Sequence, residues 1–329
     1  MKHAHILLFI GKGGVGKTTC SVTTAVHLAD KGYKVLLVSL DPAHNAGDAL
    51  DCSLNDQKTS VTPTLDALEI DLETLIQRYL KQTSETMRHT YRYLTVINLE
   101  KFFEMIRYSP GIEEQATLEA LKNIIFQEAY HYDAIVFDTA PTGLTLRVLA
   151  LPSLSMLWTQ KLTGLRKKIL DLRSSIAHIH GEQYLTVEGV QEKLATSEDD
   201  DATMRELRQY HTEIERIRKT LTNPNLTSVA AVLNAEEMPL LETERAAEAL
   251  KKFQIPLKLL IVNKVLRFEQ TPPEFVRKIH QQEAIIARAS QAFPQQTLLQ
   301  APWQPEEPRG LANLRRFCPE AAAFFMNLL

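Results

Sequence analysis

Short apolar runs recur along the chain, and segments with a helical spacing of apolar residues separate them. A run at residues 5–10 ends in a glycine-rich stretch, and apolar residues then recur at helical spacing over 17–31. Continuous apolar runs at 34–40 and 134–137 are flanked by polar or turn residues, as is typical of strands buried on both faces. These patterns predict a strand, a loop and a helix in succession, within a parallel sheet.

The alternation of strand and helix continues through the second half of the chain. Apolar runs at 228–233, 257–262 and 297–299 predict three further strands, and helical patterns at 241–253 and 273–293 separate them. The sequence therefore predicts an α/β fold, in which an open, mainly parallel sheet is flanked by helices.

Two long regions, at about 72–127 and 152–222, interrupt this alternation, because they are helical in pattern and contain no convincing strand. We interpret them as a helical subdomain inserted in a single domain over 1–329, although a chain of this length also permits two domains. The acidic run at 198–201 is expected to be a solvated loop. The unusually apolar stretch at 151–172 is expected to pack mainly in the core, with a binding surface as the alternative.

Composition and charge narrow the class of protein. The chain of 329 residues is 44% hydrophobic and 23% charged, which is ordinary for a folded soluble protein. A net charge of -3 without a strongly basic segment argues against nucleic acid as a partner. Cys20, Cys52 and Cys318 lie far apart, and no Cys/His cluster has metal-ligand spacing, which predicts a reduced, cytoplasmic protein without structural zinc. No signal peptide or membrane span is expected.

A phosphate-binding loop lies between the first predicted strand and the first predicted helix. Residues 11–18 match the pattern G-x-x-x-x-G-K-[ST], whose glycines let backbone N–H groups turn toward phosphate oxygens. Lys17 adds a positive charge beside the β- and γ-phosphates, and the hydroxyl of Thr18 can bind Mg²⁺. We therefore expect ATP and Mg²⁺ as cofactors, with nucleotide contacts from Gly11, Lys12, Gly13, Gly14, Val15, Gly16, Lys17, Thr18 and Thr19.

Two acidic residues, Asp41 and Asp138, follow predicted strands. Because ligands bind at the carboxyl ends of the strands in an open parallel sheet, both should face the phosphates. We expect Asp41 to orient the water that attacks the γ-phosphate, although Asp-Pro is also a turn signal. Asp138 is expected to hold Mg²⁺ directly or through water. Residues 142–147 have the small and polar character of a segment that moves on hydrolysis, with a helix cap at Thr142 as the alternative or additional role.

Three motifs occur in order, GKGGVGKTT at 11–19, DPAHNAGDAL at 41–50 and DTAPTGLTLRVLALP at 138–152. With them the chain resembles the ATPase family that comprises the arsenite-pump ATPases and the guided-entry ATPase for tail-anchored membrane proteins. The resemblance covers nearly the whole chain and includes further segments at 108–114 and 262–265. It implies a P-loop ATPase.

The resemblance also implies roles for individual residues. Lys12, the second lysine of the loop, would reach across a homodimer to the partner's nucleotide. Asn45 would lie beside the nucleotide, and Asn263 would form a hydrogen bond to adenine, with a strand-end turn as the alternative. Pro302 and Trp303 would border the base, although Trp303 could instead belong to the core.

Departures from the family pattern leave the cellular role open. Leu144 stands where the family has a histidine, and neither the interface zinc cysteines nor the metalloid cysteines are present. We expect a Mg²⁺-dependent ATPase that works as a nucleotide-switched homodimer and binds a hydrophobic membrane-protein client, in the cytoplasm and transiently at a membrane receptor. The alternative is an ATPase that energises a membrane permease for arsenite or antimonite. A DNA- or membrane-partitioning ATPase is disfavoured by the helical insertions and the low basicity. The apolar stretch at 321–329 is expected to be a helix that docks on the core.

Overall fold

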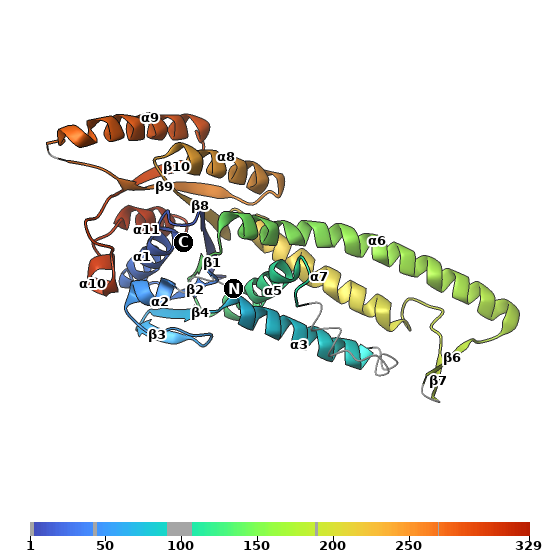
Figure 1. Cartoon of the computed structure of the whole chain (residues 1–329). Coiled ribbons are helices and arrows are strands. Elements are labelled where there is room, and N and C mark those ends of the chain that lie inside the picture. Colours follow the sequence, from blue (N-terminus) through green and yellow to red (C-terminus); the bar gives the residue numbers. More distant parts are fainter. Residues whose placement is uncertain (1–2, 42–44, 91–106, 188–189, 269) are drawn as a thin grey trace. The chain divides into compact units, whose positions relative to one another are not determined.

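The chain contains two compact units. The computed structural model describes residues 3–41, 45–90, 107–187, 190–268 and 270–329 (Figure 1). One unit, here called the sheet unit, comprises Met1–Leu75, Thr117–Leu149 and Thr220–Leu329. The other, the helical unit, comprises Ile76–Ala116 and Ala150–Lys219. The organisation of the chain as one domain with an inserted subdomain stays a prediction.

The described part of the sheet unit forms an eight-stranded sheet in the order β10-β9-β8-β1-β5-β2-β4-β3. Neighbouring strands are parallel except for β3 and β4, and β1 lies between β8 and β5, so that Leu8 pairs with Val229 and Phe137. The predicted α/β fold with an open, mainly parallel sheet is thereby confirmed. The strands are β1 (His5–Gly11), β2 (Val35–Ser39), β3 (Thr59–Thr62), β4 (Leu65–Glu69), β5 (Ala134–Asp138), β8 (Thr227–Asn234), β9 (Leu257–Val265) and β10 (Thr297–Pro302).

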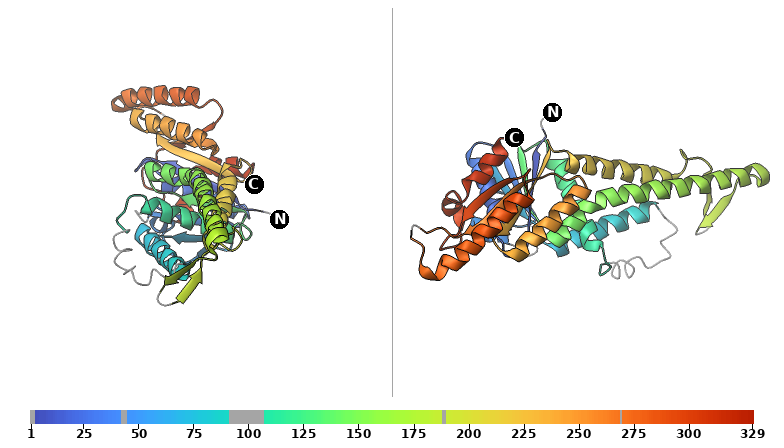
Figure 2. Two further views of the ribbon diagram at one scale, coloured as in Figure 1. Left: turned by 90° about the vertical axis from the view of Figure 1, so that its right-hand side faces the viewer. Right: turned by 90° about the horizontal axis from the view of Figure 1, so that it is seen from above.

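Helices cover both faces of the sheet, which explains why its central strands β1, β2, β5 and β8 are buried along almost their whole length. Leu259 and Ile261 of β9 pack in a core cluster with α1 and α11, whereas Leu260 and Val262 pack in a second cluster with α8 and α9. Successive side chains of a strand alternate between faces in this way. Figures 1 and 2 show α8 and α9 side by side near β9. These helices are α1 (Lys17–Asp30), α8 (Glu237–Lys252), α9 (Val276–Ala292) and α11 (Pro319–Met326).

The remaining elements complete the two units. A short helix, α2 (Asn45–Leu50), follows β2, and α10 (Gly310–Leu314) precedes α11. The other elements are α3 (Leu72–Thr90), α5 (Ile112–Glu128), α6 (Thr142–His180), α7 (Ala202–Thr222), η2 (Pro273–Phe275) and the hairpin strands β6 (Tyr184–Val187) and β7 (Val190–Lys193). None of the helices in the described ranges has the length and apolar character needed to cross a membrane.

The predicted C-terminal helix docks on the core, as α11 packs against α1. Arg315 donates to both carboxylate oxygens of Asp30, at the end of α1, with distances of 2.8 Å. A ring nitrogen of His27 lies 3.2 Å from the carbonyl oxygen of Phe317. The segment that contains α10 and α11 is therefore joined to the helix that begins at the phosphate-binding loop.

The sequence patterns missed four short strands. The β3–β4 hairpin was not predicted, because its strands have only four and five residues and β3 is partly exposed. The region 152–222 was expected to lack strands, and the β6–β7 hairpin shows that this expectation was wrong. Strands of four or five residues are too short for their hydrophobic pattern to be separated from that of loops.

The acidic run at 198–201 is only in part the solvated loop that was expected. Asp201 is buried and accepts two hydrogen bonds from Arg166 of α6, at 3.0 and 2.6 Å. Its carboxylate also accepts the N–H of Met204 at 2.7 Å and so caps the start of α7. Glu198 pairs with Lys167. The run therefore helps to join α6 to α7 within the helical unit.

The apolar stretch at 151–172 was expected to pack mainly in the core, and this was wrong for most of its large side chains. Leu170 is buried, but six others are between 44% and 66% exposed. We call these six the α6 apolar stripe: Leu154, Leu157, Trp158, Leu162, Leu165 and Leu172.

His5 is a buried titratable side chain at the start of β1. Its ring nitrogen Nε2 lies 2.8 Å from the hydroxyl oxygen of Ser228 on the neighbouring strand. Burial, and to a lesser degree the charge of Lys258, lower the pKa of His5 from its ordinary value of 6.5 to about 4. The folded protein thus holds this imidazole neutral in a pH range where the unfolded chain protonates it.

We predict that acid destabilises the protein partly through His5. As the pH falls below 6.5 the unfolded chain gains a proton at His5, and the folded chain gains it only near pH 4, so stability is lost across this window. The pKa difference corresponds to about 3 kcal/mol. Urea denaturation at about pH 7 and about pH 4.5 should show a smaller loss of unfolding free energy in His5→Gln than in the wild type. Equal losses in both proteins would contradict this assignment.

Candidate functional site

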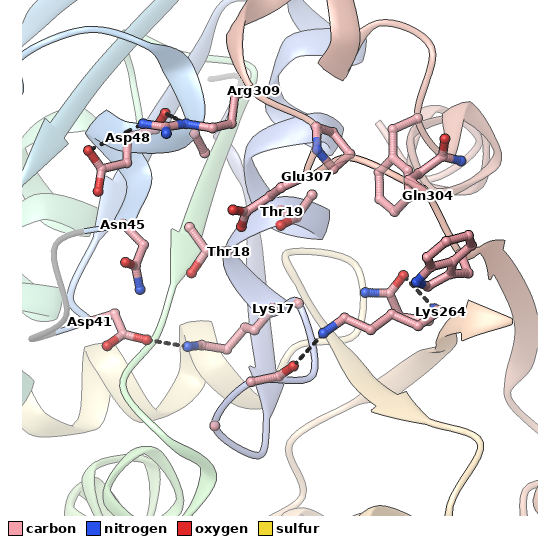
Figure 3. A pocket seen from close by; sticks show the side chains of 18 of the residues that line it. Lys17, Thr18, Thr19, Asp41, Asn45, Asp48, Lys264, Gln304, Glu307 and Arg309 are labelled. Atoms are coloured by element: carbon pink, nitrogen blue, oxygen red, sulfur yellow. Dashed lines mark hydrogen bonds and ion pairs between the residues drawn. The ribbon is translucent and has the colours of Figure 1, made fainter.

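A cleft of about 720 Å³ lies at the carboxyl edge of the sheet, within the sheet unit (Figure 3). Its wall contains most of the residues that the sequence singled out: Lys12, Gly13, Gly14, Gly16, Lys17, Thr18 and Thr19 from the first motif, and Asp41, Asn45, Asn263 and Pro302 from elsewhere. Gly11, Val15 and Asp138 are buried behind this wall. Residues 42–44 of the second motif lie outside the described residues.

The loop conformation depends on Gly16, which precedes α1. Its φ of 92° is in the left-handed region that favours glycine, and a Cβ there would lie 2.2 Å from Nδ2 of Asn263. None of the side chains that the structure describes caps the start of α1, and the first turn of this helix contains no acidic residue. The N–H groups of that turn and the positive end of the helix dipole therefore remain available to an anion in the cleft.

Lys17 lies between two carboxylates at the bottom of the cleft. Its Nζ is 2.5 Å from Oδ2 of Asp41 and 3.7 Å from Oδ1 of Asp138, and all three side chains are largely buried. The two acids reach the same lysine because β5 lies between β1 and β2 in the sheet. This arrangement places the charges predicted for phosphate binding and hydrolysis within one small group.

Asp138 has the character of a divalent-metal ligand. Neither of its buried carboxylate oxygens receives a hydrogen bond of ordinary length from a described residue. Burial raises its pKa to about 6, and the nearby charge of Lys17 limits this rise. A carboxylate and the hydroxyl of Thr18 are the hard oxygen donors that Mg²⁺ prefers. The described residues contain no group of three or more His, Cys, Asp or Glu side chains that could hold a metal, so phosphate and water would supply the other ligands.

Asn45 is placed at the cleft by a buried acid. It begins α2, and the next N–H, that of Ala46, donates to Oε1 of Glu69 at 3.0 Å. Figure 3 shows Asn45 in the same part of the cleft as Thr18 and Asp41. Glu69 could not be identified from sequence patterns, because its contact with Ala46 joins residues that are 23 positions apart.

The opposite end of the cleft is formed by β9 and β10. Pro302 ends β10, and the N–H of Trp303 donates to the carbonyl of Val265 at 2.9 Å. Trp303 is 47% exposed on the cleft wall, so the alternative that it belongs to the core is excluded. Asn263 lies within β9 rather than after it, and its Nδ2 donates to the carbonyl of Val15 at 2.8 Å. It is therefore part of a contact with the loop, not of a strand-end turn.

Two basic residues at the cleft were missed by sequence reasoning. Lys264 donates from Nζ to the carbonyl of Gly14 at 2.9 Å. Arg309 donates to the carbonyl of Asp48 at 3.2 Å, and its guanidinium lies 3.7 Å from the Asp48 carboxylate. The Asn-Lys pair at the end of an apolar run was visible in the sequence, but its contact with a loop 250 positions earlier was not.

Leu144 faces an apolar pocket rather than the cleft. It lies in the first turn of α6, which begins at Thr142, and lines this pocket with Leu8, Leu121 and Val148. At this position the chain thus has a hydrophobic contact where a histidine could form hydrogen bonds.

Comparisons with known proteins agree with this geometry. The model of the anion-transporting ATPase family matches residues 4–321. A protein named putative arsenical pump-driving ATPase 2, from Aquifex aeolicus, is 30% identical over 313 residues, which cover 95% of this chain and 97% of that protein. An ATPase ASNA1 homolog from Entamoeba histolytica is 31% identical over 93% of this chain and 90% of its own length. The protein named ATPase get3 from Schizosaccharomyces japonicus is 29% identical over 93% of this chain and 89% of its own length.

The resemblance stated from the motifs is thereby confirmed over nearly the whole chain. The parallel sheet, the phosphate-binding loop and the acids beside Lys17 agree with a P-loop enzyme that hydrolyses ATP. The chain is an ATPase and belongs to the anion-transporting ATPase family.

Proposed function

We propose that the protein is a nucleotide-switched homodimer that couples ATP hydrolysis to the binding of a hydrophobic client. The α6 apolar stripe is the observation that supports client binding. It lies in the helical unit, while the residues of the nucleotide cleft lie in the sheet unit. The expected location, in the cytoplasm with transient visits to a membrane receptor, belongs to the same proposal.

The chemistry at the cleft follows from the positions of the charges. Backbone N–H groups at the start of α1 and the ammonium of Lys17 bind the phosphates of ATP. Asp138, directly or through water, and Thr18 hold Mg²⁺, which neutralises charge on the β- and γ-phosphates when bound. A phosphate that binds Lys17 weakens the Lys17–Asp41 ion pair, and Asp41 then becomes available to orient the attacking water. Asn45, Asn263 and Pro302 border the nucleotide.

Asp41→Asn should bind ATP but hydrolyse it at least about 100-fold more slowly, because an amide cannot accept a proton from the attacking water. Steady-state phosphate release measures the rate, and calorimetry with MgATP measures binding. Asp48→Asn is the matched control, since it alters another acid of the cleft that is not bound to Lys17, and it should keep nearly the wild-type rate. Turnover by Asp41→Asn close to that of the wild type would remove Asp41 from this role.

The dimer proposal is supported by Lys12. Its side chain is exposed at the cleft and forms no ion pair with any residue in the described ranges. An exposed lysine beside the phosphate site can reach a nucleotide bound to a second copy of the chain. Two clefts facing each other across a two-fold axis would each receive one such lysine.

We predict complementation between two inactive variants. In a dimer of one Lys12→Ala and one Asp41→Asn subunit, the Lys12→Ala subunit keeps its own Asp41 and receives Lys12 from its partner. An equal mixture should therefore regain roughly a quarter of wild-type activity, because half of the dimers are mixed and each has one intact site. If Lys12 acts within its own subunit, mixing restores nothing. Analytical ultracentrifugation of the same samples shows that dimers form, and co-purification of an affinity-tagged variant with the untagged one shows that their subunits exchange.

The α6 apolar stripe has the geometry of a binding surface. Leu154, Trp158, Leu162 and Leu165 are spaced by three or four residues, and Leu172 follows seven residues later, so they share one helix face. Exposed apolar surface of this extent marks interaction sites in soluble proteins. A transmembrane segment of a client is an apolar helix of matching character.

Replacing the stripe should remove client binding without removing ATP hydrolysis. Leu157→Ser/Leu165→Ser/Leu172→Ser is expected to lose most of its capture of a leucine-rich 20-residue helix fused to a soluble reporter, measured by co-purification after co-expression. Gln160→Ser/Lys161→Ser/Lys168→Ser alters exposed polar residues of the same helix and should capture as much as the wild type. Unchanged capture by the leucine variant would argue against the stripe as the client site.

A pump-driving role for a metalloid permease is the alternative, and the name of the Aquifex aeolicus relative supports it. The cysteines do not favour direct metalloid binding. Burial raises the thiol pKa of Cys20 and Cys318, which keeps both sulfurs protonated and poor as ligands. Stimulation of ATP hydrolysis by arsenite or antimonite would favour the pump role over client binding.

A further inference from the structure

The end of β9 holds the phosphate-binding loop through two successive residues. Nδ2 of Asn263 donates to the carbonyl of Val15 at 2.8 Å, and Nζ of Lys264 donates to the carbonyl of Gly14 at 2.9 Å. Oδ1 of Asn263 accepts the backbone N–H of Lys264 at 2.8 Å, which joins the two donors to each other. Two consecutive carbonyls of the loop are therefore fixed from one strand. Figure 3 shows the contact of Lys264 as a dashed line.

Contact by two successive side chains requires an unusual backbone. Successive side chains of a regular strand point to opposite faces, so only one of Asn263 and Lys264 would reach the loop. Lys264 has a φ of 58°, in the left-handed region that L-residues rarely adopt. Four non-glycine residues with positive φ occur in the described chain, and the other three, Asp51, Gln254 and Cys318, lie outside strands. Disfavoured backbone of this kind concentrates at functional sites.

We propose that Lys264 is a positioning residue, which orients the phosphate-binding loop by holding the Gly14 carbonyl outside the phosphate site. The peptide unit is planar, so its C=O and N–H point in opposite directions. The contact of Lys264 with Gly14 therefore fixes the N–H of Val15, which donates to the carbonyl of Lys12 within the loop at 3.4 Å. The contact of Asn263 with Val15 likewise directs the N–H of Gly16. Both N–H groups belong to the loop that would surround the phosphates.

This inference rests on the proposed binding of ATP phosphates by the loop. It predicts that the loss of Lys264 lowers the affinity for nucleotides whatever their base, which the loss of a base contact would not do. Lys264 also lines the cleft near Trp303 and could touch the base itself. A residue that orients the loop affects every nucleotide with the same phosphates equally, whereas a base contact distinguishes adenine from other bases. Because the loop holds ground state and transition state alike, its loss raises KM more than it lowers kcat.

The test compares Lys264→Met, Lys264→Arg and the wild type. Lys264→Met should weaken binding of MgATP, MgADP and MgITP by about tenfold each, because it removes a charge-assisted hydrogen bond to the loop. Its KM for ATP should rise by a similar factor with kcat nearly unchanged. Lys264→Arg, which keeps a charged donor, should recover most of the affinity. Calorimetry and steady-state phosphate release measure these quantities, and thermal unfolding checks that each variant is folded.

The matched control is Lys258→Met, since Lys258 lies on the same strand and donates to another backbone carbonyl, that of Pro224. It should leave nucleotide binding unchanged. Unaltered affinity of Lys264→Met, or a loss confined to adenine nucleotides, would overturn the inference and leave the proposed site intact. If Lys17→Ala also bound MgATP like the wild type, the loop would not be the nucleotide site, and both the site and the role of Lys264 would be refuted.

Discussion

The charge of Lys17 is the constraint on which the cleft depends. A buried ammonium is costly unless oppositely charged groups surround it, and here Asp41 and Asp138 supply them at 2.5 and 3.7 Å. The lysine begins α1, one acid follows β2 and the other ends β5, so a single charge group joins three elements at the carboxyl edge of the sheet. An anion that enters the cleft competes with these carboxylates for Lys17, which gives ligand binding a direct effect on the segments that carry them.

Much of this arrangement was predictable because it is local in sequence. The loop, its strand and its helix occupy one continuous segment, and apolar runs that are buried on both faces identify parallel strands well. The contacts of Asn263, Lys264 and Glu69 were not predictable, since they join segments 23 to 250 positions apart. Helical periodicity showed that residues 151–172 have an apolar face, but it could not show whether another element covers that face.

The two compact units differ in the kind of surface they present. The sheet unit has a cleft whose wall contains charged side chains and loop backbone, while the helical unit has the exposed α6 apolar stripe. Ion pairs such as Arg166–Asp201 join α6 to α7 independently of the apolar face. The residues of the α6 apolar stripe could therefore change without affecting phosphate binding. Such independence agrees with a family in which one relative is named an arsenical pump-driving ATPase and another ATPase get3.

The packing of α11 on α1 has a consequence for how the chain folds. The ion pair between Asp30 and Arg315 spans 285 positions. The part of α1 that packs against α10 and α11 stays uncovered until those later residues have left the ribosome, whereas the rest of the helix can already pack against β1, β2, β5 and α2. At about 5–20 residues per second, synthesis of that interval takes from roughly a quarter of a minute to a minute. During this time the helix next to the phosphate-binding loop exposes apolar surface, which is the kind of segment that chaperones bind. The nucleotide site would therefore be completed late in synthesis, although its main motif is made first.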